Sequence, residues 1–88
     1  MRRLLIVEDD QNILDYLAFA LSGIPNLDLC QTPTITSARA VLIENQFDAV
    51  LLDLGLPDGN GLDLIESDVF PNNIPTFILT AAIDRDMI

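Results

Sequence analysis

The chain has 88 residues, half of them apolar, and a net charge of −10 with only four cationic side chains, all of them Arg. This acidity argues against direct binding of nucleic acid or of an anionic membrane surface by this segment. The absence of His removes His-based catalytic triads and His-ligated zinc sites from consideration. No apolar run approaches the roughly 20 residues of a membrane span, so we expect one small, soluble, cytoplasmic domain.

The first third of the chain is predicted to form two strands with a helix between them. Arg3–Val7 is a short apolar run, typical of a strand buried on both faces of a parallel sheet. Apolar residues then recur at largely helical spacing from about Asp10 to Ser22, and Gly23 follows as a helix terminator. In Leu27–Gln31 the side chains of Leu27 and Leu29 alternate with those of Asp28 and Cys30. This alternation favours a strand near the sheet edge.

The rest of the chain continues the alternation of helix and strand. A second amphipathic helix begins after Thr34 or Thr36 as N-cap, and Phe47–Leu52 is the third predicted strand. Residues 55–61 have the composition of a loop, and a short helical stretch follows them. Ile74–Leu79 is the fourth predicted strand. This order predicts right-handed crossovers and therefore a doubly wound parallel sheet of the α/β class.

Carboxylates follow two of the predicted strands at the point where each strand ends. Glu8, Asp9 and Asp10 follow the first strand, and Asp53 follows the third. The carboxyl ends of neighbouring parallel strands meet at one edge of the sheet, where such folds bind ligands. Like charges gathered there repel one another unless a cation or a proton relieves them. The sequence therefore predicts a site for a hard divalent cation such as Mg²⁺.

Three motifs, in chain order, resemble those of the receiver domain of two-component response regulators. They stand at the ends of the first, third and fourth predicted strands and comprise Leu5–Asp10, Leu51–Gly61 and Ile78–Ala81. The resemblance spans the whole chain. It implies a flavodoxin-like receiver fold, in which helices flank a parallel sheet of strand order 2-1-3-4-5.

The resemblance also implies roles for individual residues. Glu8 and Asp9 resemble the acidic pair that holds Mg²⁺ or Mn²⁺, and the carbonyl of Gly55 would be a backbone ligand of the same ion. Asp53 resembles the phosphoacceptor, which takes a phosphoryl group from a sensor histidine kinase or a phosphotransfer protein. Thr80 resembles the switch hydroxyl that bonds the phosphoryl group. The chemistry of the residues agrees, because a carboxylate attacks an anionic phosphoryl group poorly unless a cation neutralises the approach.

Several of these residues also have simpler interpretations. Asp10 is expected to be mainly the N-cap and dipole partner of the first helix. Residues 58–61 are expected to form a turn, because no phosphate-binding glycine pattern is present. Glu8 and Asp9 could lie in a solvated loop. Thr80 could simply end a strand, as β-branched residues commonly do.

The sequence departs from the family at its carboxyl end. Receiver domains carry a Lys at the end of a fifth strand, where its ammonium contacts the phosphoryl group, and this chain contains no Lys. We therefore expect residues 1–88 to be a partial, C-terminally truncated receiver domain that lacks the fifth strand and the last helices. Metal binding should persist in it, whereas efficient phosphotransfer and signal output should not. An output domain, often DNA-binding in the family, would lie beyond Ile88.

Two other functions remain open. Phosphohydrolases of the haloacid-dehalogenase type also use a strand-end Asp with Mg²⁺, but they place a second Asp two residues later, where this chain has Gly55. A receiver-like module could instead bind protein partners without being phosphorylated, and the missing Lys adds weight to this alternative without making it the leading one. We expect a signalling domain rather than an enzyme, and phosphorylation of Asp53 distinguishes the alternatives.

The fourth predicted strand also indicates self-association. In the family's strand order the fifth strand pairs with the fourth, so without it Ile74–Leu79 would form an open apolar edge. The sheet face that carries the Ile13–Leu21 helix would also be partly bare. We expect a dimer or another self-associated form, with the fourth strand at the contact.

Overall fold

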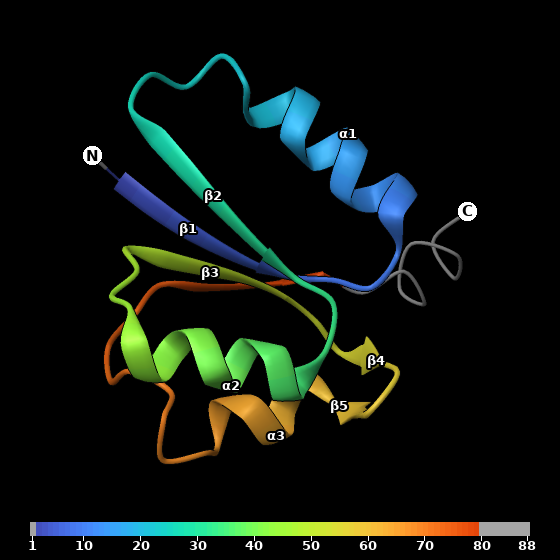
Figure 1. Ribbon diagram of the computed structural model, residues 1–88, viewed down its shortest axis with the longest axis vertical. Helices are drawn as coiled ribbons and strands as arrows, with labels where there is room; N and C mark the ends of the chain where they lie inside the picture. Colours follow the sequence, from blue (N-terminus) through green and yellow to red (C-terminus); the bar gives the residue numbers. More distant parts are fainter. Residues whose placement is uncertain (1, 80–88) are drawn as a thin grey trace.

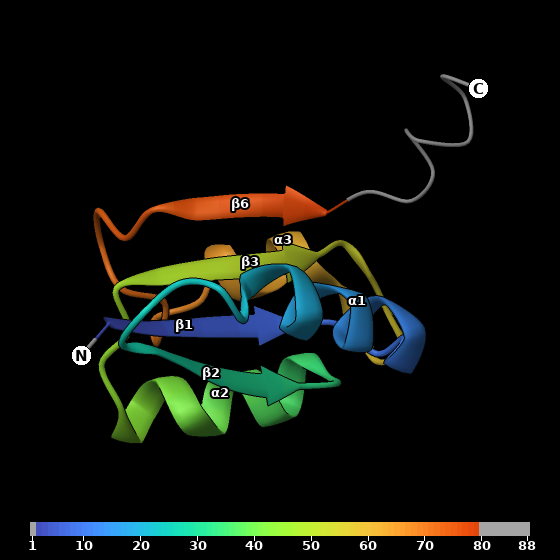
Figure 2. The ribbon, with the colours of Figure 1, turned by 90° about the horizontal axis from the view of Figure 1, so that it is seen from above.

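The computed structural model describes residues 2–79, which form a parallel sheet with helices on both faces. The sheet has four strands in the order β2-β1-β3-β6, and neighbouring strands are parallel (Figure 2). Their bounds are Arg2–Val7 for β1, Leu27–Thr32 for β2, Ala49–Asp53 for β3 and Thr76–Leu79 for β6. The predicted α/β fold is confirmed, with the strand order that the resemblance implies for the first four predicted strands.

Within residues 2–79, three helices cover the two faces of the sheet. The α1 helix (Gln11–Leu21) lies on one face, whereas α2 (Ile35–Glu44) and α3 (Gly61–Ile65) lie on the other (Figure 1). Because successive strand residues point to opposite faces, the strands contribute to two cores. The buried core beneath α1 contains Leu4, Ile6 and Leu14. The buried core beneath α2 and α3 contains Leu5, Val7, Ala38, Leu42, Val50, Leu52, Leu56 and Leu64. No helix in residues 2–79 is long and apolar enough to cross a membrane.

The capping residues of the first two helices follow from the sequence. Asp10 is the N-cap of α1, and its carboxylate accepts a hydrogen bond from the Asn12 amide at 2.9 Å, as predicted. Of the two candidate caps of α2, Thr34 occupies the N-cap position. The reason is Ser37, whose amide donates to the Thr34 hydroxyl and whose hydroxyl accepts from the Thr34 amide. Thr36, by contrast, lies in the first turn of the helix.

The segment after β3, predicted to be a loop, contains a short antiparallel pair of strands. The β4 strand (Gly55–Leu56) pairs with β5 (Gly59–Asn60), and we call this pair the β4–β5 ribbon. Leu56 anchors the ribbon, because its side chain is buried in the core beneath α2 and α3. Gly59 has a φ of +146°, a conformation that side chains rarely allow. Composition indicated the turn correctly but not the pairing.

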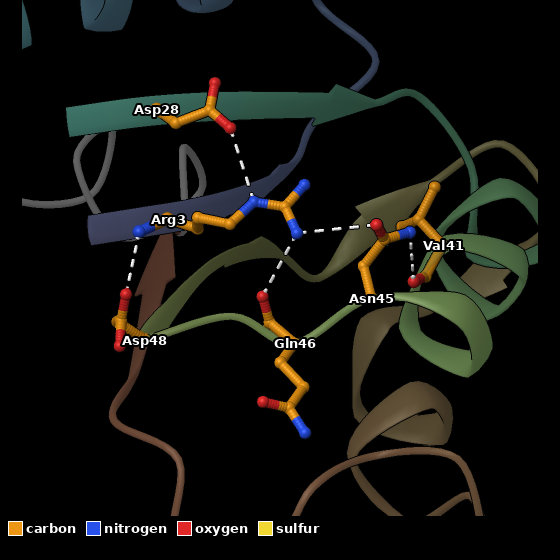
Figure 3. A network of polar contacts seen from close by, with 6 residues as sticks. All are labelled: Arg3, Asp28, Val41, Asn45, Gln46 and Asp48. Atoms are coloured by element: carbon orange, nitrogen blue, oxygen red, sulfur yellow. Dashed lines mark hydrogen bonds and ion pairs between the residues drawn. The ribbon is translucent and has the colours of Figure 1, made fainter. Parts of the chain in front are cut away.

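Arg3 holds together the end of the sheet where β1 begins (Figure 3). Its Nε lies 3.3 Å from a carboxylate oxygen of Asp28 on β2. Its Nη1 donates to the side-chain oxygen of Asn45 and to the carbonyl of Gln46, each at 3.4 Å. The guanidinium also lies over the Phe47 ring, 4.9 Å from its centroid. One side chain therefore joins two strands to the turn that leads into β3.

The β6 strand lies at one edge of the sheet, beside β3 (Figure 2). In the part of the chain that the structure describes, β6 pairs with β3 alone. Phe77 and Ile78 are 58% and 43% exposed and point to opposite faces. Thr80, the predicted switch residue, follows this strand and lies outside the described residues.

Candidate metal centre

The acidic residues of two sequence motifs meet at one edge of the sheet. The β1 and β3 strands are neighbours and end together, with Val7 paired to Leu52. Glu8 and Asp9 follow β1 directly, and Asp53 is the last residue of β3. One carboxylate oxygen from each of these three residues lies within 4.8 Å of the others. The convergence predicted from the strand ends is therefore present, and we call these three residues the acidic cluster.

Glu8 is the buried member of the acidic cluster. Its side chain is only 2% exposed, and its Oε1 accepts a hydrogen bond from the Asp10 amide at 3.0 Å. Its own amide donates to the Thr32 carbonyl at 3.0 Å, which fixes its backbone beside β2. Burial, opposed by the Asp10 hydrogen bond and reinforced by the negative charges of Asp53 and Asp9, raises the pKa of Glu8 from 4.5 to about 6. A positive charge at this place would relieve that penalty.

Asp53 is half-buried and is held by the segment that follows it. Its Oδ1 accepts a hydrogen bond from the Gly55 amide at 3.3 Å. Gly61, the first residue of α3, donates its amide to the Leu54 carbonyl at 2.9 Å. A Cβ on Gly61 would collide with the Asp53 carbonyl oxygen and would approach the Leu52 side chain to 3.1 Å. Only glycine fits there, so the start of α3 packs directly against the backbone of Asp53.

The donor set of the acidic cluster fits a hard divalent cation. Mg²⁺ prefers oxygen ligands in octahedral geometry and usually takes one or two carboxylates together with waters and phosphate oxygens. The cluster offers three carboxylates, one of them buried. Within residues 2–79 the only ion pair joins Arg3 to Asp28, at the other end of the sheet. No ion pair of the described part therefore neutralises the cluster.

The other residues singled out in the sequence lie around the cluster or beyond the described chain. Gly55 begins β4, two residues after Asp53, and is exposed. Asp10 caps α1 and is not a member of the cluster. Thr80 lies outside the described residues. No local pattern in the sequence indicates the hydrogen bonds that Asp58 makes to α2, because they join residues more than 20 positions apart.

The raised pKa of Glu8 predicts a pH-dependent effect of the Glu8→Gln substitution. Folding raises this pKa from 4.5 to about 6, so the folded state holds the proton more tightly and loses stability as the pH rises through that interval. Without metal, Glu8→Gln should stabilise the chain by about 2 kcal/mol above pH 6, with no gain below pH 4.5. Urea unfolding with a chelator present measures this difference. The control Glu66→Gln, at an exposed position, should give no pH-dependent gain in stability. A Glu8→Gln gain of the same size above pH 6 and below pH 4.5 would contradict the prediction.

The comparison with known families agrees with the geometry of the fold and of the cluster. The family model that describes the response regulator receiver domain matches residues 4–88 of this chain. The chain belongs to this family. Receiver domains are signalling domains, and the match extends across both strand ends that carry the acidic cluster.

Several relatives and solved structures are similar to the chain. The swarming motility regulation protein RssB of Serratia marcescens is 43% identical over 79 residues, which are 89% of this chain and 36% of that protein. The KDP operon transcriptional regulatory protein KdpE of Escherichia coli is 33% identical over 81 residues, 92% of this chain and 36% of that protein. The chain thus spans about a third of the length of these curated relatives.

Among solved structures, the non-phosphorylated HemR receiver domain from Leptospira biflexa matches with a TM-score of 0.80 and 37% identity, over 99% of this chain and 73% of that one. The MaeR response regulator bound to beryllium trifluoride has a TM-score of 0.80 and 30% identity, over 99% of this chain and 76% of that one. Both neighbours therefore share the fold of the whole described sheet.

Proposed function

We propose that the chain accepts a phosphoryl group on Asp53 from a sensor histidine kinase or a phosphotransfer protein. In this proposal Mg²⁺ or Mn²⁺ is held by Glu8, Asp9, Asp53 and the carbonyl of Gly55. The observation that carries it is the convergence of three carboxylates within 4.8 Å at the carboxyl ends of β1 and β3, in a chain of the receiver family. The beryllium trifluoride on MaeR supports it, because that protein binds a small fluoride complex on the same fold.

We infer an in-line transfer to Asp53. A carboxylate oxygen of Asp53 attacks the phosphorus of the donor, the bond from phosphorus to the donor nitrogen breaks, and its electron pair leaves with the donor imidazole, which takes up a proton. The product is an acyl phosphate on Asp53. When bound, the divalent cation supplies positive charge for the phosphoryl oxygens. Gly61 keeps the Asp53 backbone fixed during the attack, since α3 packs directly on it.

The signal would be passed to an output domain outside this chain. KdpE is a transcriptional regulatory protein, and the relative MtrA of Mycobacterium tuberculosis is a DNA-binding response regulator, 34% identical over 83 residues. The net charge of −10 makes DNA contact by this segment unfavourable.

We propose that Thr80 is the switch hydroxyl that bonds the phosphoryl group. We also propose that the chain works in the cytoplasm beside its kinase.

Phosphoryl incorporation tests this function against its alternative. The chain is incubated with a small phosphodonor and Mg²⁺, and the mass of the intact protein is measured over time. Loss of the added mass on treatment with hydroxylamine identifies an acyl phosphate. We expect one phosphoryl group per chain, gained slowly, because the sequence contains no Lys to contact the phosphoryl group. If the gene continues beyond Ile88, the longer protein is tested in parallel. No incorporation in either protein would favour a receiver-like interaction module that is not phosphorylated.

Within residues 2–79, β6 has a neighbouring strand on one side only, and its other edge predicts self-association of the 88-residue chain. An unpaired apolar strand edge readily pairs with another chain, and Phe77 is 58% exposed on that strand. We expect light scattering to show a dimer or larger species, and Phe77→Lys to reduce it. Ile43→Lys is the matched control, because Ile43 is an exposed apolar residue on α2, on the sheet face opposite α1. A monodisperse 9.7 kDa monomer with a cooperative melt would contradict the prediction.

A further inference from the structure

Asp58 fastens the turn of the β4–β5 ribbon to the start of α2. Its Oδ1 accepts a hydrogen bond from the Ile35 amide at 2.9 Å. Its Oδ2 accepts from the Thr36 amide at 3.0 Å and from the Thr36 hydroxyl at 2.9 Å. The amide bonds, that of Ile35 foremost, lower the pKa of Asp58, as expected where hydrogen bonds favour the charged carboxylate. Figure 1 shows the ribbon beside the end of α2 that follows β2.

These bonds complete the amino terminus of α2. The first amides of a helix have no partner within the helix. The capping box of Thr34 and Ser37 engages their own two amides, and Asp58 accepts from the two amides between them. The helix end and the ribbon are therefore joined by hydrogen bonds to a carboxylate, which are stronger than those between neutral groups.

The ribbon that Asp58 holds also carries Gly55, next to the acidic cluster. At its base, Gly61 packs against the backbone of Asp53, and at its turn Asp58 is bonded to α2. A ribbon of two residue pairs has little stability of its own. Its position therefore depends on three holds: Leu56 in the core, the contact of Gly61 with Asp53 at its base, and the bonds of Asp58 at its turn.

We propose that Asp58 is a positioning residue. By fastening the β4–β5 ribbon to α2, it holds Gly55 where the Gly55 carbonyl can join the acidic cluster in binding the cation. The inference rests on the proposed function, because the metal site is the one proposed there. It assigns to the first turn of α2 a part in metal binding, although none of its residues belongs to the acidic cluster. Loss of the Asp58 carboxylate should loosen the ribbon more than the helix, which keeps its own cap.

Calorimetric titration of the 88-residue chain with Mg²⁺ tests the proposal. Asp58→Ala should weaken Mg²⁺ binding about tenfold, the lower end of the cost of removing an outer-shell partner of a metal site. Asp58→Asn should recover part of the loss, because its amide oxygen still accepts one bond. Thr36→Val removes one bond to Asp58 without changing the charge, and it should weaken binding to a smaller extent.

Two control variants separate this role from simpler ones. Thr34→Ala weakens the same helix end but leaves the bonds of Asp58 in place, and Asp68→Ala removes one negative charge from an exposed position outside the acidic cluster. Both should bind Mg²⁺ as the parent does. If Asp58→Ala also binds as the parent does, or if either control loses as much affinity as Asp58→Ala, the positioning role is wrong.

Hydrogen exchange without metal distinguishes failure of this inference from failure of the proposed function. Absence of Mg²⁺ binding by the parent chain would overturn the metal site itself. The effect of Asp58 on the ribbon is then measured by the hydrogen-exchange rates of the Gly55 and Gly61 amides. These rates should be higher in Asp58→Ala than in Thr34→Ala. Equal exchange in the two variants would overturn the role of Asp58 in either case.

Discussion

Replacing Asp53 by Asn should abolish phosphoryl incorporation, from one group per chain to none. The substitution keeps the size of the side chain but removes the anionic oxygen that we propose attacks phosphorus. Intact mass after incubation with a small phosphodonor and Mg²⁺ measures the effect. Asp68→Asn is the matched control, because Asp68 is exposed and lies outside the acidic cluster. It removes the same charge and should leave incorporation unchanged.

Two results would contradict the assignment of Asp53. Incorporation that persists in Asp53→Asn would move the acceptor role to another carboxylate, with Glu8 and Asp9 the first to examine, because both lie in the same cluster. These two carboxylates differ in their accessibility to a phosphodonor, because Glu8 is only 2% exposed whereas Asp9 is exposed. Equal loss of incorporation in Asp68→Asn would show that the change acts through net charge rather than through the nucleophile.

The arrangement of the acidic cluster could be predicted from the sequence because it depends on strand order. Short apolar runs place β1 and β3 inside a parallel sheet, and parallel strands that end together bring Glu8, Asp9 and Asp53 to one edge. The cap of α1 was also predictable, since the Asp10 carboxylate bonds an amide only two residues away. Both features depend on local pattern together with simple topology.

Other features could not be predicted, because contacts between distant residues decide them. The third strand begins at Ala49 rather than at Phe47, whose ring instead lies beneath the guanidinium of Arg3. Asp58 appeared only as a turn residue, yet its carboxylate bonds the start of α2. Gly61 falls within the turn predicted for residues 58–61, whereas it begins α3 and is required by contact with the Asp53 carbonyl oxygen. In each case the partner lies elsewhere in the fold, where no local signal records it.

Saturating Mg²⁺ should stabilise the folded chain strongly, because the proposed site is a cluster that exists only when β1 and β3 are paired. At a hundredfold excess over the dissociation constant the gain is about 2.7 kcal/mol, which corresponds to a rise in melting temperature of roughly 10–20 °C for a domain of this size. Thermal unfolding at matched ionic strength, with NaCl replacing MgCl₂ in the reference, separates specific binding from screening.

An Asp9→Asn, Asp53→Asn double variant should lose this gain, since it removes two of the three carboxylates of the acidic cluster. Without metal it should unfold at or above the temperature of the parent, because the repulsion around buried Glu8 is relieved. Asp63→Asn with Asp68→Asn removes the same charge from exposed positions outside the cluster and should keep the full response to Mg²⁺. A double variant of the cluster that gains as much from Mg²⁺ as the parent would exclude the proposed site. Loss of the response in both double variants would instead show that Mg²⁺ acts on the overall negative charge of the chain.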